Sequence, residues 1–149
     1  MPDRLFSGLK TAWDVGSMST TFTGGLHFGP TAAEDTSWPH VTMMDLGNAL
    51  RFATSGGESS QAEFRNHAFQ MTIWWKEDGV TDPILAIGAL MRTLDAWMQS
   101  HNTTLFRSAS EGYVIEVTNA DERIMEADDE RVWQGQIDYN ARRVKNVNA

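Results

Sequence analysis

The sequence predicts an α+β fold, in which an antiparallel sheet of about four or five strands carries one long helix on a face and a short N-terminal helix. Three patterns predict it. Apolar and polar residues alternate around residues 69–75, and again in two segments nearer the C-terminal end, as they do in half-buried strands. Between these segments, apolar residues recur every three or four positions, which is the period of an amphipathic helix.

The first alternating segment should form a central strand, because one of its faces is apolar throughout. The residues of this apolar face are Phe69, Met71, Ile73 and Trp75. The residues of the opposite, mixed face are Ala68, Gln70, Thr72 and Trp74. Successive side chains of a strand point to opposite faces of the sheet, so the apolar face is predicted to contact the core.

The long helix is predicted to begin at Asp82 and to end near His101. Asp82 can cap the helix with its side chain, and Pro83 suits the first helical position, which needs no backbone N–H. The apolar stripe consists of Ile84, Ile87, Met91, Leu94 and Met98, widened by Leu85, Leu90 and Trp97. A stripe of two heptads is too short for a coiled coil, so the helix is expected to pack on the sheet.

The last two strands are predicted to form a long antiparallel hairpin. Their apolar positions are Tyr113, Ile115 and Val117 in one strand, and Trp133, Ile137, Tyr139 and Ala141 in the other. An acidic turn around residues 127–130 joins them, so Met125 should lie near Val132, and Val117 near Asn140. The chain after Val144 is expected to fray.

The N-terminal half offers weaker patterns. Leu5, Phe6, Leu9 and Trp13 have helical spacing after Asp3, a residue that can cap a helix. Residues 16–25 are predicted to be a loop, and residues 26–28 and 40–46 two short strands. The segment from Gly47 to Ala62 is rich in Gly, Ser and Asn, so it is predicted to be the longest loop.

Composition limits the classes of function. A chain of 149 residues suits a single domain spanning residues 1–149. The formal net charge of -8 disfavours gripping nucleic acid, but suits a surface past which DNA slides without sticking. The absence of cysteine excludes disulfides and thiolate metal sites and fits synthesis in a reducing cytoplasm. The longest apolar run, Ile84 to Met91, is far shorter than the ~20 residues that span a bilayer, and no secretory signal is apparent.

Chemical motifs receive no support from the sequence. The four histidines lack the spacing of metal-ligand pairs, and the acidic cluster at 121–130 fits no calcium loop, so it is predicted to be a solvated hairpin tip. Neither Gly24-Gly25 nor Gly56-Gly57 is followed by the lysine of a phosphate-binding loop. We therefore assign no catalytic residue, no metal and no cofactor, and expect the chain not to be an enzyme.

Two tryptophans lie where a partner could contact them. Trp38 lies in a polar loop and Trp74 on the mixed face of the central strand. Exposed aromatic residues often anchor protein interfaces, although local burial would account equally well for both side chains.

The order of the elements resembles that of the tail-terminator and tail-completion proteins of long-tailed bacteriophages. The resemblance extends over about residues 5–143, and its order is a helix, His27-Phe28-Gly29-Pro30, a strand led by Trp38-Pro39, the 69–75 strand, a long helix and a last strand beginning Trp133-Gln134-Gly135. The short pairs that match the family are Ile73-Trp74, Leu94-Asp95 and Asp138-Tyr139. The long connection from Gly47 to Ala62 departs from the family pattern.

The resemblance implies a structural virion protein of the tail or neck, synthesised in the host cytoplasm. Such a subunit joins copies of itself in a ring, usually a hexamer, and the ring caps the tail tube protein and meets a head-completion or neck protein. DNA would pass through the channel without specific binding, and no membrane would be involved.

A ring subunit needs projecting contact elements, and the sequence offers two besides the tryptophans. They are the Arg51 to Gln61 segment and the hairpin tip, because both are polar and are expected to project from an apolar sheet. The candidate contact residues are Trp38, Arg51, Phe52, Gly56, Gly57, Glu58, Trp74, Asp128, Asp129 and Glu130.

Two other functions stay open at this point. A head-completion protein, or another protein of the neck or tube, would share the acidic surface and the ring, and would differ in its position in the particle. A small ligand-binding or hydrolytic α+β domain would instead require a deep apolar pocket beneath the helix.

Overall fold

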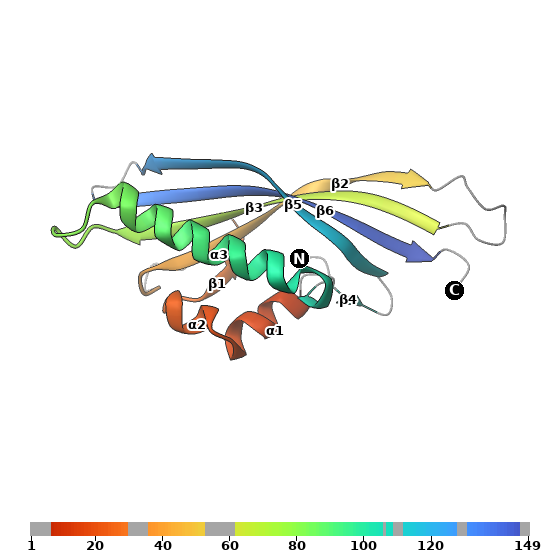
Figure 1. Ribbon diagram of the computed structural model, residues 1–149, viewed down its shortest axis with the longest axis horizontal. Coiled ribbons are helices and arrows are strands. Elements are labelled where there is room, and N and C mark those ends of the chain that lie inside the picture. The colour runs from red at the N-terminus through yellow and green to blue at the C-terminus, as the bar shows by residue number, and fades with distance from the viewer. Residues whose placement is uncertain are drawn as a thin grey trace.

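The computed structural model consists mainly of a six-stranded sheet (Figure 1). The helix α3 (Pro83–Leu105) crosses one face of this sheet. The structure describes residues 7–29, 36–52, 62–105, 107–108, 112–127 and 131–146. The other elements are α1 (Ser7–Val15), α2 (Met18–Thr21), β1 (Leu26–Phe28), β2 (His40–Phe52), β3 (Ala62–Lys76), β4 (Arg107–Ser108), β5 (Gly112–Glu126) and β6 (Val132–Asn146). The predicted α+β class is confirmed.

The strands follow the order β1-β2-β3-β6-β5-β4. Each neighbouring pair is antiparallel except β1 and β2, which run parallel with Leu26 opposite Val41 and Phe28 opposite Met43. The prediction of an antiparallel sheet is therefore wrong at this edge. Parallel neighbours cannot be joined by a two-residue hairpin turn, and residues 29–39 separate β1 from β2.

The core lies between α3 and the odd-numbered side chains of β3 and β6. Met71 and Ile73 are fully buried, and they pair across the sheet with Ile137 and Gly135. Gly135 lies where the helix comes closest, since a Cβ atom there would be 2.8 Å from Ile87 Cγ2. These positions confirm the predicted central strand and its apolar face.

The N-terminal helices pack on the same side of the sheet as α3 (Figure 1). Trp13 is fully buried, and its ring centroid lies 5.5 Å from those of both Phe22 and Trp97. The amphipathic first helix is confirmed over Ser7–Val15, while residues 1–6 lie outside the described ranges. Part of the predicted 16–25 loop is instead the short helix α2.

Strand β2 continues into the segment that was predicted to be the longest loop, and β3 begins at its last residue, Ala62. Phe52 pairs with Glu63, so residues 47–52 belong to β2. A β-bulge between Asp45 and Gly47 keeps the ladder going, and Gly47 accommodates it with a φ of +102°. Backbone pairing does not depend on apolar side chains, which explains why the polar composition misled the prediction.

The C-terminal hairpin differs from its predicted register. Met125 pairs with Gln134, and Val117 pairs with Ala141, after a bulge between Asn119 and Asp121. The predicted register is two residues off at the turn end, where Met125 was expected near Val132, and the bulge, which adds one residue to β5, reduces this difference to one at Val117. The strand β6 runs to Asn146, opposite Ala62, so the predicted fraying from residue 144 is wrong up to that residue.

The long helix begins where the sequence predicted. The backbone N–H of Ile84 donates to Asp82 Oδ1 at 2.9 Å, which confirms Asp82 as the cap. The helix continues past the predicted end at His101 as far as Leu105. Ile87, Leu94 and Met98 are fully buried, so the central part of the predicted stripe faces the core.

Candidate interaction surfaces

Apart from Val15 and Met125, the exposed large apolar side chains that the structure describes fall into two separate groups. The first, which we call the α3–β5 patch, consists of Val80, Ile84, Leu85 and Ile124. The second, the β2 patch, consists of Trp38, Met44 and Leu46. In the sheet, β2 and β5 lie on opposite sides of the β3–β6 pair, so the two patches are separated by the width of the central strands. Exposed apolar groups that cluster in this way typically mark contact surfaces.

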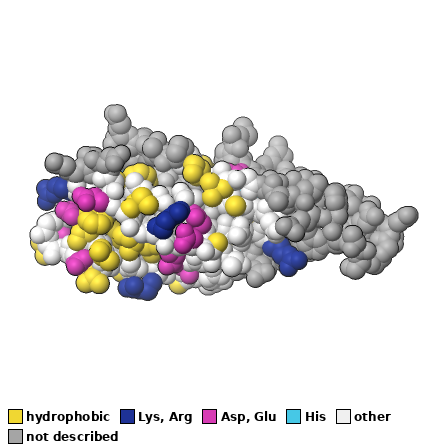
Figure 2. Space-filling model, turned by 90° about the horizontal axis from the view of Figure 1, so that it is seen from above, with side chains coloured by type: hydrophobic (Ala, Val, Ile, Leu, Met, Phe, Trp, Pro, Cys, Tyr) yellow, Lys and Arg dark blue, Asp and Glu magenta, His cyan; other side chains and the backbone are white. Residues whose placement is uncertain are grey.

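Figure 2 shows hydrophobic side chains gathered toward one end of the described surface, with acidic and basic side chains among them. Protein interfaces commonly have this composition, in which an apolar centre excludes water and charged groups at the rim orient the partner.

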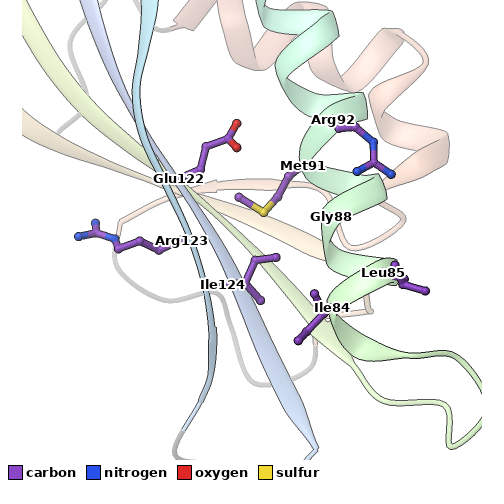
Figure 3. Close-up of a pocket in the computed structure, with 8 residues that line it drawn as sticks. All are labelled: Ile84, Leu85, Gly88, Met91, Arg92, Glu122, Arg123 and Ile124. Atoms are coloured by element: carbon purple, nitrogen blue, oxygen red, sulfur yellow. The ribbon is translucent and has the colours of Figure 1, made fainter.

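The α3–β5 patch encloses a groove of about 510 Å³. Its lining residues are Ile84, Leu85, Gly88, Met91, Arg92, Glu122, Arg123 and Ile124. In Figure 3, Ile84 and Met91 extend from the helix toward β5, and Ile124 extends from β5 toward the helix. Gly88 has no side chain to fill the space between them. The groove therefore has an apolar floor built from two elements that are far apart in the sequence.

Charged side chains border this groove without converging on one point. Arg123 turns away from α3 (Figure 3) and donates to Asp138 Oδ2 at 3.1 Å. Glu122 accepts a hydrogen bond of 2.7 Å from Asn119 Nδ2. Arg92 makes no hydrogen bond or ion pair with any residue in the described part of the chain. The groove thus presents one cation that is available to a partner.

The bulge in the β2 patch is held by contacts of Asp45 with His67 and with the backbone of Gly47. Asp45 Oδ1 lies 2.7 Å from His67 Nε2 and accepts a hydrogen bond of 2.8 Å from the backbone N–H of Gly47. His67 is fully buried, whereas the Asp45 side chain is 44% exposed. These bonds fix the bulge on which Leu46 stands, and Leu46 is 48% exposed. The bulge therefore presents an apolar side chain next to a carboxylate.

The structure brings Trp38 and Trp74 together around His40. The ring centroids of Trp38 and Trp74 lie 4.7 and 6.2 Å from that of His40. Trp74 is half-buried and donates from Nε1 to Thr42 Oγ1 at 2.9 Å, while Trp38 is 38% exposed. Local packing accounts for Trp74, and Trp38 keeps a free surface.

The environment of His40 makes stability depend on pH. Burial lowers the pKa of His40 below 6.5, the nearby His27 acts in the same direction, and the bond to the Ser37 carbonyl opposes them. As the pH falls through 6.5, the unfolded chain takes up this proton more readily than the folded chain, so stability should fall. We expect the loss of unfolding free energy between about pH 7.5 and about pH 5 to be smaller in His40→Gln, measured by urea denaturation. Equal losses in both proteins would show that His40 does not cause the pH dependence of stability.

Other polar groups pair with one another and hold elements together. The Tyr139 hydroxyl donates to Asp95 Oδ1 at 2.8 Å, and so ties β6 to α3. Burial and the neighbouring Asp95 raise the pKa of Tyr139, which keeps the hydroxyl protonated as the donor. On the other face of the sheet, Gln70 Nε2 donates to Asp138 Oδ1 at 2.9 Å. Within the described ranges, no group of three or more His, Asp or Glu side chains is placed to hold a metal ion.

The remaining predicted contact residues fall into two sets. Arg51 and Phe52 belong to β2, where they pair with Phe64 and Glu63, so their assignment to a projecting loop is wrong. The others, Gly56, Gly57, Glu58, Asp128, Asp129 and Glu130, lie outside the described residues.

Sequence reasoning missed the groove. Ile84 and Leu85 were assigned to the buried stripe, yet they are 58% and 69% exposed. No local signal separates them from the buried part of the stripe, since Trp97 and Met98 are also adjacent apolar residues of this helix and both are buried.

No protein-family model and no curated protein matches the sequence. The fold, however, is similar to that of a chain in a solved particle described as "Virion of native gene transfer agent (GTA) particle". The two chains share a fold. The TM-score is 0.56 at 10% sequence identity, and the match covers 95% of this chain and 92% of that chain. Within the described part of this chain, no helix is both long and apolar enough to cross a membrane.

Proposed function

We propose that this protein is a structural subunit of a phage-like virion, and that it acts as the tail terminator. In this role, copies of the chain form a ring that caps the tail tube and joins it to the head-completion complex. The observation that carries the proposal is the fold likeness to a chain of the gene transfer agent virion, which extends over nearly all of both chains. The order of elements and the short pairs in the sequence support the terminator role within such a particle.

The two exposed patches support an assembly role. A ring subunit meets one neighbour with one surface and the other neighbour with a different surface. The α3–β5 patch and the β2 patch lie toward opposite sides of one sheet, which is the arrangement that such a contact needs. Strand pairing and the packed helix keep the separation of the patches constant.

The net charge of -8 supports a ring through which DNA passes. Phosphate is repelled by an acidic wall, so the DNA does not stick to it as the genome enters or leaves. This role requires no catalytic group. It depends on the shape of the subunit and on its surface contacts.

Deleting the gene from the phage or particle that encodes it tests this function. We expect tails of uncontrolled length and heads that remain unjoined, both visible by electron microscopy, with restoration by the intact gene. Tails of normal length beside unjoined heads would instead indicate a head-completion protein. Normal particles that lack the chain would refute a virion role.

The Arg51 to Gln61 segment and the hairpin tip with Asp128, Asp129 and Glu130 are proposed as further contact elements. Deleting residues 56–59 should then lower the yield of infectious particles, scored by titre and by tail length. Infectious particles with normal tails after this deletion would show that the segment is dispensable.

A further inference from the structure

We propose that the groove between α3 and β5 of one copy receives the β2 bulge of the next copy. Leu46 would lie on the groove floor and Asp45 beside Arg92. The inference rests on the proposed ring function, and it names the contact from which the ring is built.

The positions of the two surfaces favour a second copy as the occupant. The groove belongs to β5 and the bulge to β2, and these strands lie on opposite sides of the β3–β6 pair. A contact between them joins two different surfaces, so it leaves a free groove on one copy and a free bulge on the other. Such a contact repeats from head to tail and closes into a ring when the rotation allows.

The shapes and polarities of the two surfaces match. The groove has a volume of about 510 Å³ and a floor of Ile84, Met91 and Ile124, and Gly88 adds no side chain to fill it. On the bulge, Leu46 is 48% exposed, and the neighbouring Met44 is 37% exposed. Seating Leu46 in the groove would remove apolar surface from water on both sides, which is the main favourable contribution to association.

The charges next to these apolar groups are complementary. Arg92 borders the groove without a partner among the described residues, and the bulge carries Asp45. The carboxylate uses Oδ1 for Gly47 and His67, and within the described ranges no bond is made by Oδ2. Opposite charges at the edge of an apolar contact set its orientation, so they would fix which way Leu46 enters.

Disulfide trapping tests this contact in a clean background, because the chain contains no cysteine. Two single variants, Leu46→Cys and Gly88→Cys, are made with different tags and mixed during assembly. A Cβ atom at position 88 meets only Arg92 Nη1, at 3.6 Å, so this substitution should not disturb the helix. A disulfide requires the two Cα atoms to lie within about 7 Å, so oxidation should trap dimers that carry both tags.

The matched control is Ala96→Cys, which is exposed on the same helix but does not line the groove. Mixed with Leu46→Cys, it should give no dimer above the level of random collision. A second variant carries Arg92→Glu in the Gly88→Cys chain. It places an acid opposite Asp45 of the neighbouring copy, so it should lower the yield of the trapped dimer on the order of tenfold.

The outcomes separate this contact from the function. Rings seen by native mass spectrometry or electron microscopy without a 46–88 disulfide would overturn the contact and leave the ring function standing. A Gly88→Cys chain that links to a different virion protein would overturn the second copy as the occupant, and Leu46→Cys linked only to itself would overturn the head-to-tail order. If normal particles were found to lack this chain, the proposed function itself would be refuted.

Discussion

Replacement of Trp13 by alanine is expected to lower the free energy of unfolding by about 3–5 kcal/mol. Trp13 is fully buried between Phe22 and Trp97, so it joins the N-terminal helices to α3. Removing the indole leaves a cavity that the surrounding rings can fill only in part. Urea denaturation followed by circular dichroism measures the change.

The matched control for this prediction is Trp13→Phe. Trp13 Nε1 is buried without a hydrogen-bond partner among the described residues, so phenylalanine removes an unsatisfied donor and keeps an aromatic ring against Phe22 and Trp97. The loss of unfolding free energy in Trp13→Phe should be well below that in Trp13→Ala. The phenyl ring leaves a smaller cavity, and the removal of a buried, unpaired polar group offsets part of its cost. Similar losses for both variants would contradict this prediction.

Replacement of Gly135 by valine is expected to lower the free energy of unfolding by about 1–3 kcal/mol or more. A Cβ atom at this position would lie 2.8 Å from Ile87 Cγ2 and 2.9 Å from Met91 Sδ, which is too close for carbon and sulfur atoms. Valine favours strands over glycine, so a loss of stability can only arise from the clash with α3. Thermal or urea unfolding measures it.

Gly88→Ala is the matched control on the other side of the same contact. A Cβ atom there meets only Arg92 Nη1, at 3.6 Å, and alanine favours a helix over glycine by about 1 kcal/mol. The stability of Gly88→Ala should therefore stay constant or rise. If Gly135→Val were as stable as the natural chain, α3 would have to lie farther from β6 than the structure places it.

Local patterns account for the parts of the fold that the sequence predicted correctly. The alternation at 69–75 and the cap at Asp82 depend on neighbouring residues only, so a strand and a helix start can be recognised without knowing the rest of the chain. Residues 47–52 were missed for the same reason. Their pairing with β3 is a contact between different strands, and the sequence of residues 47–52 alone does not display it.

Which apolar side chains stay exposed was predicted with less success than the elements. Trp38 was recognised because an aromatic residue in a polar segment is unusual, and it is indeed exposed. The groove combines Ile84 and Met91 of the helix with Ile124 of β5, which are separated by more than thirty residues in the chain. No local pattern relates them, so only their meeting in space reveals the surface.

The sequence by itself determined the class of fold, the apolar face of the central strand, the start of the long helix and the acidic character of the surface, because composition and periodicity act within short stretches. Only the tertiary structure decided the parallel edge pair, the bulges with their shifts of register, and the bond between Tyr139 and Asp95. It also decided which apolar residues stay uncovered, since burial depends on what the rest of the chain places against each side chain.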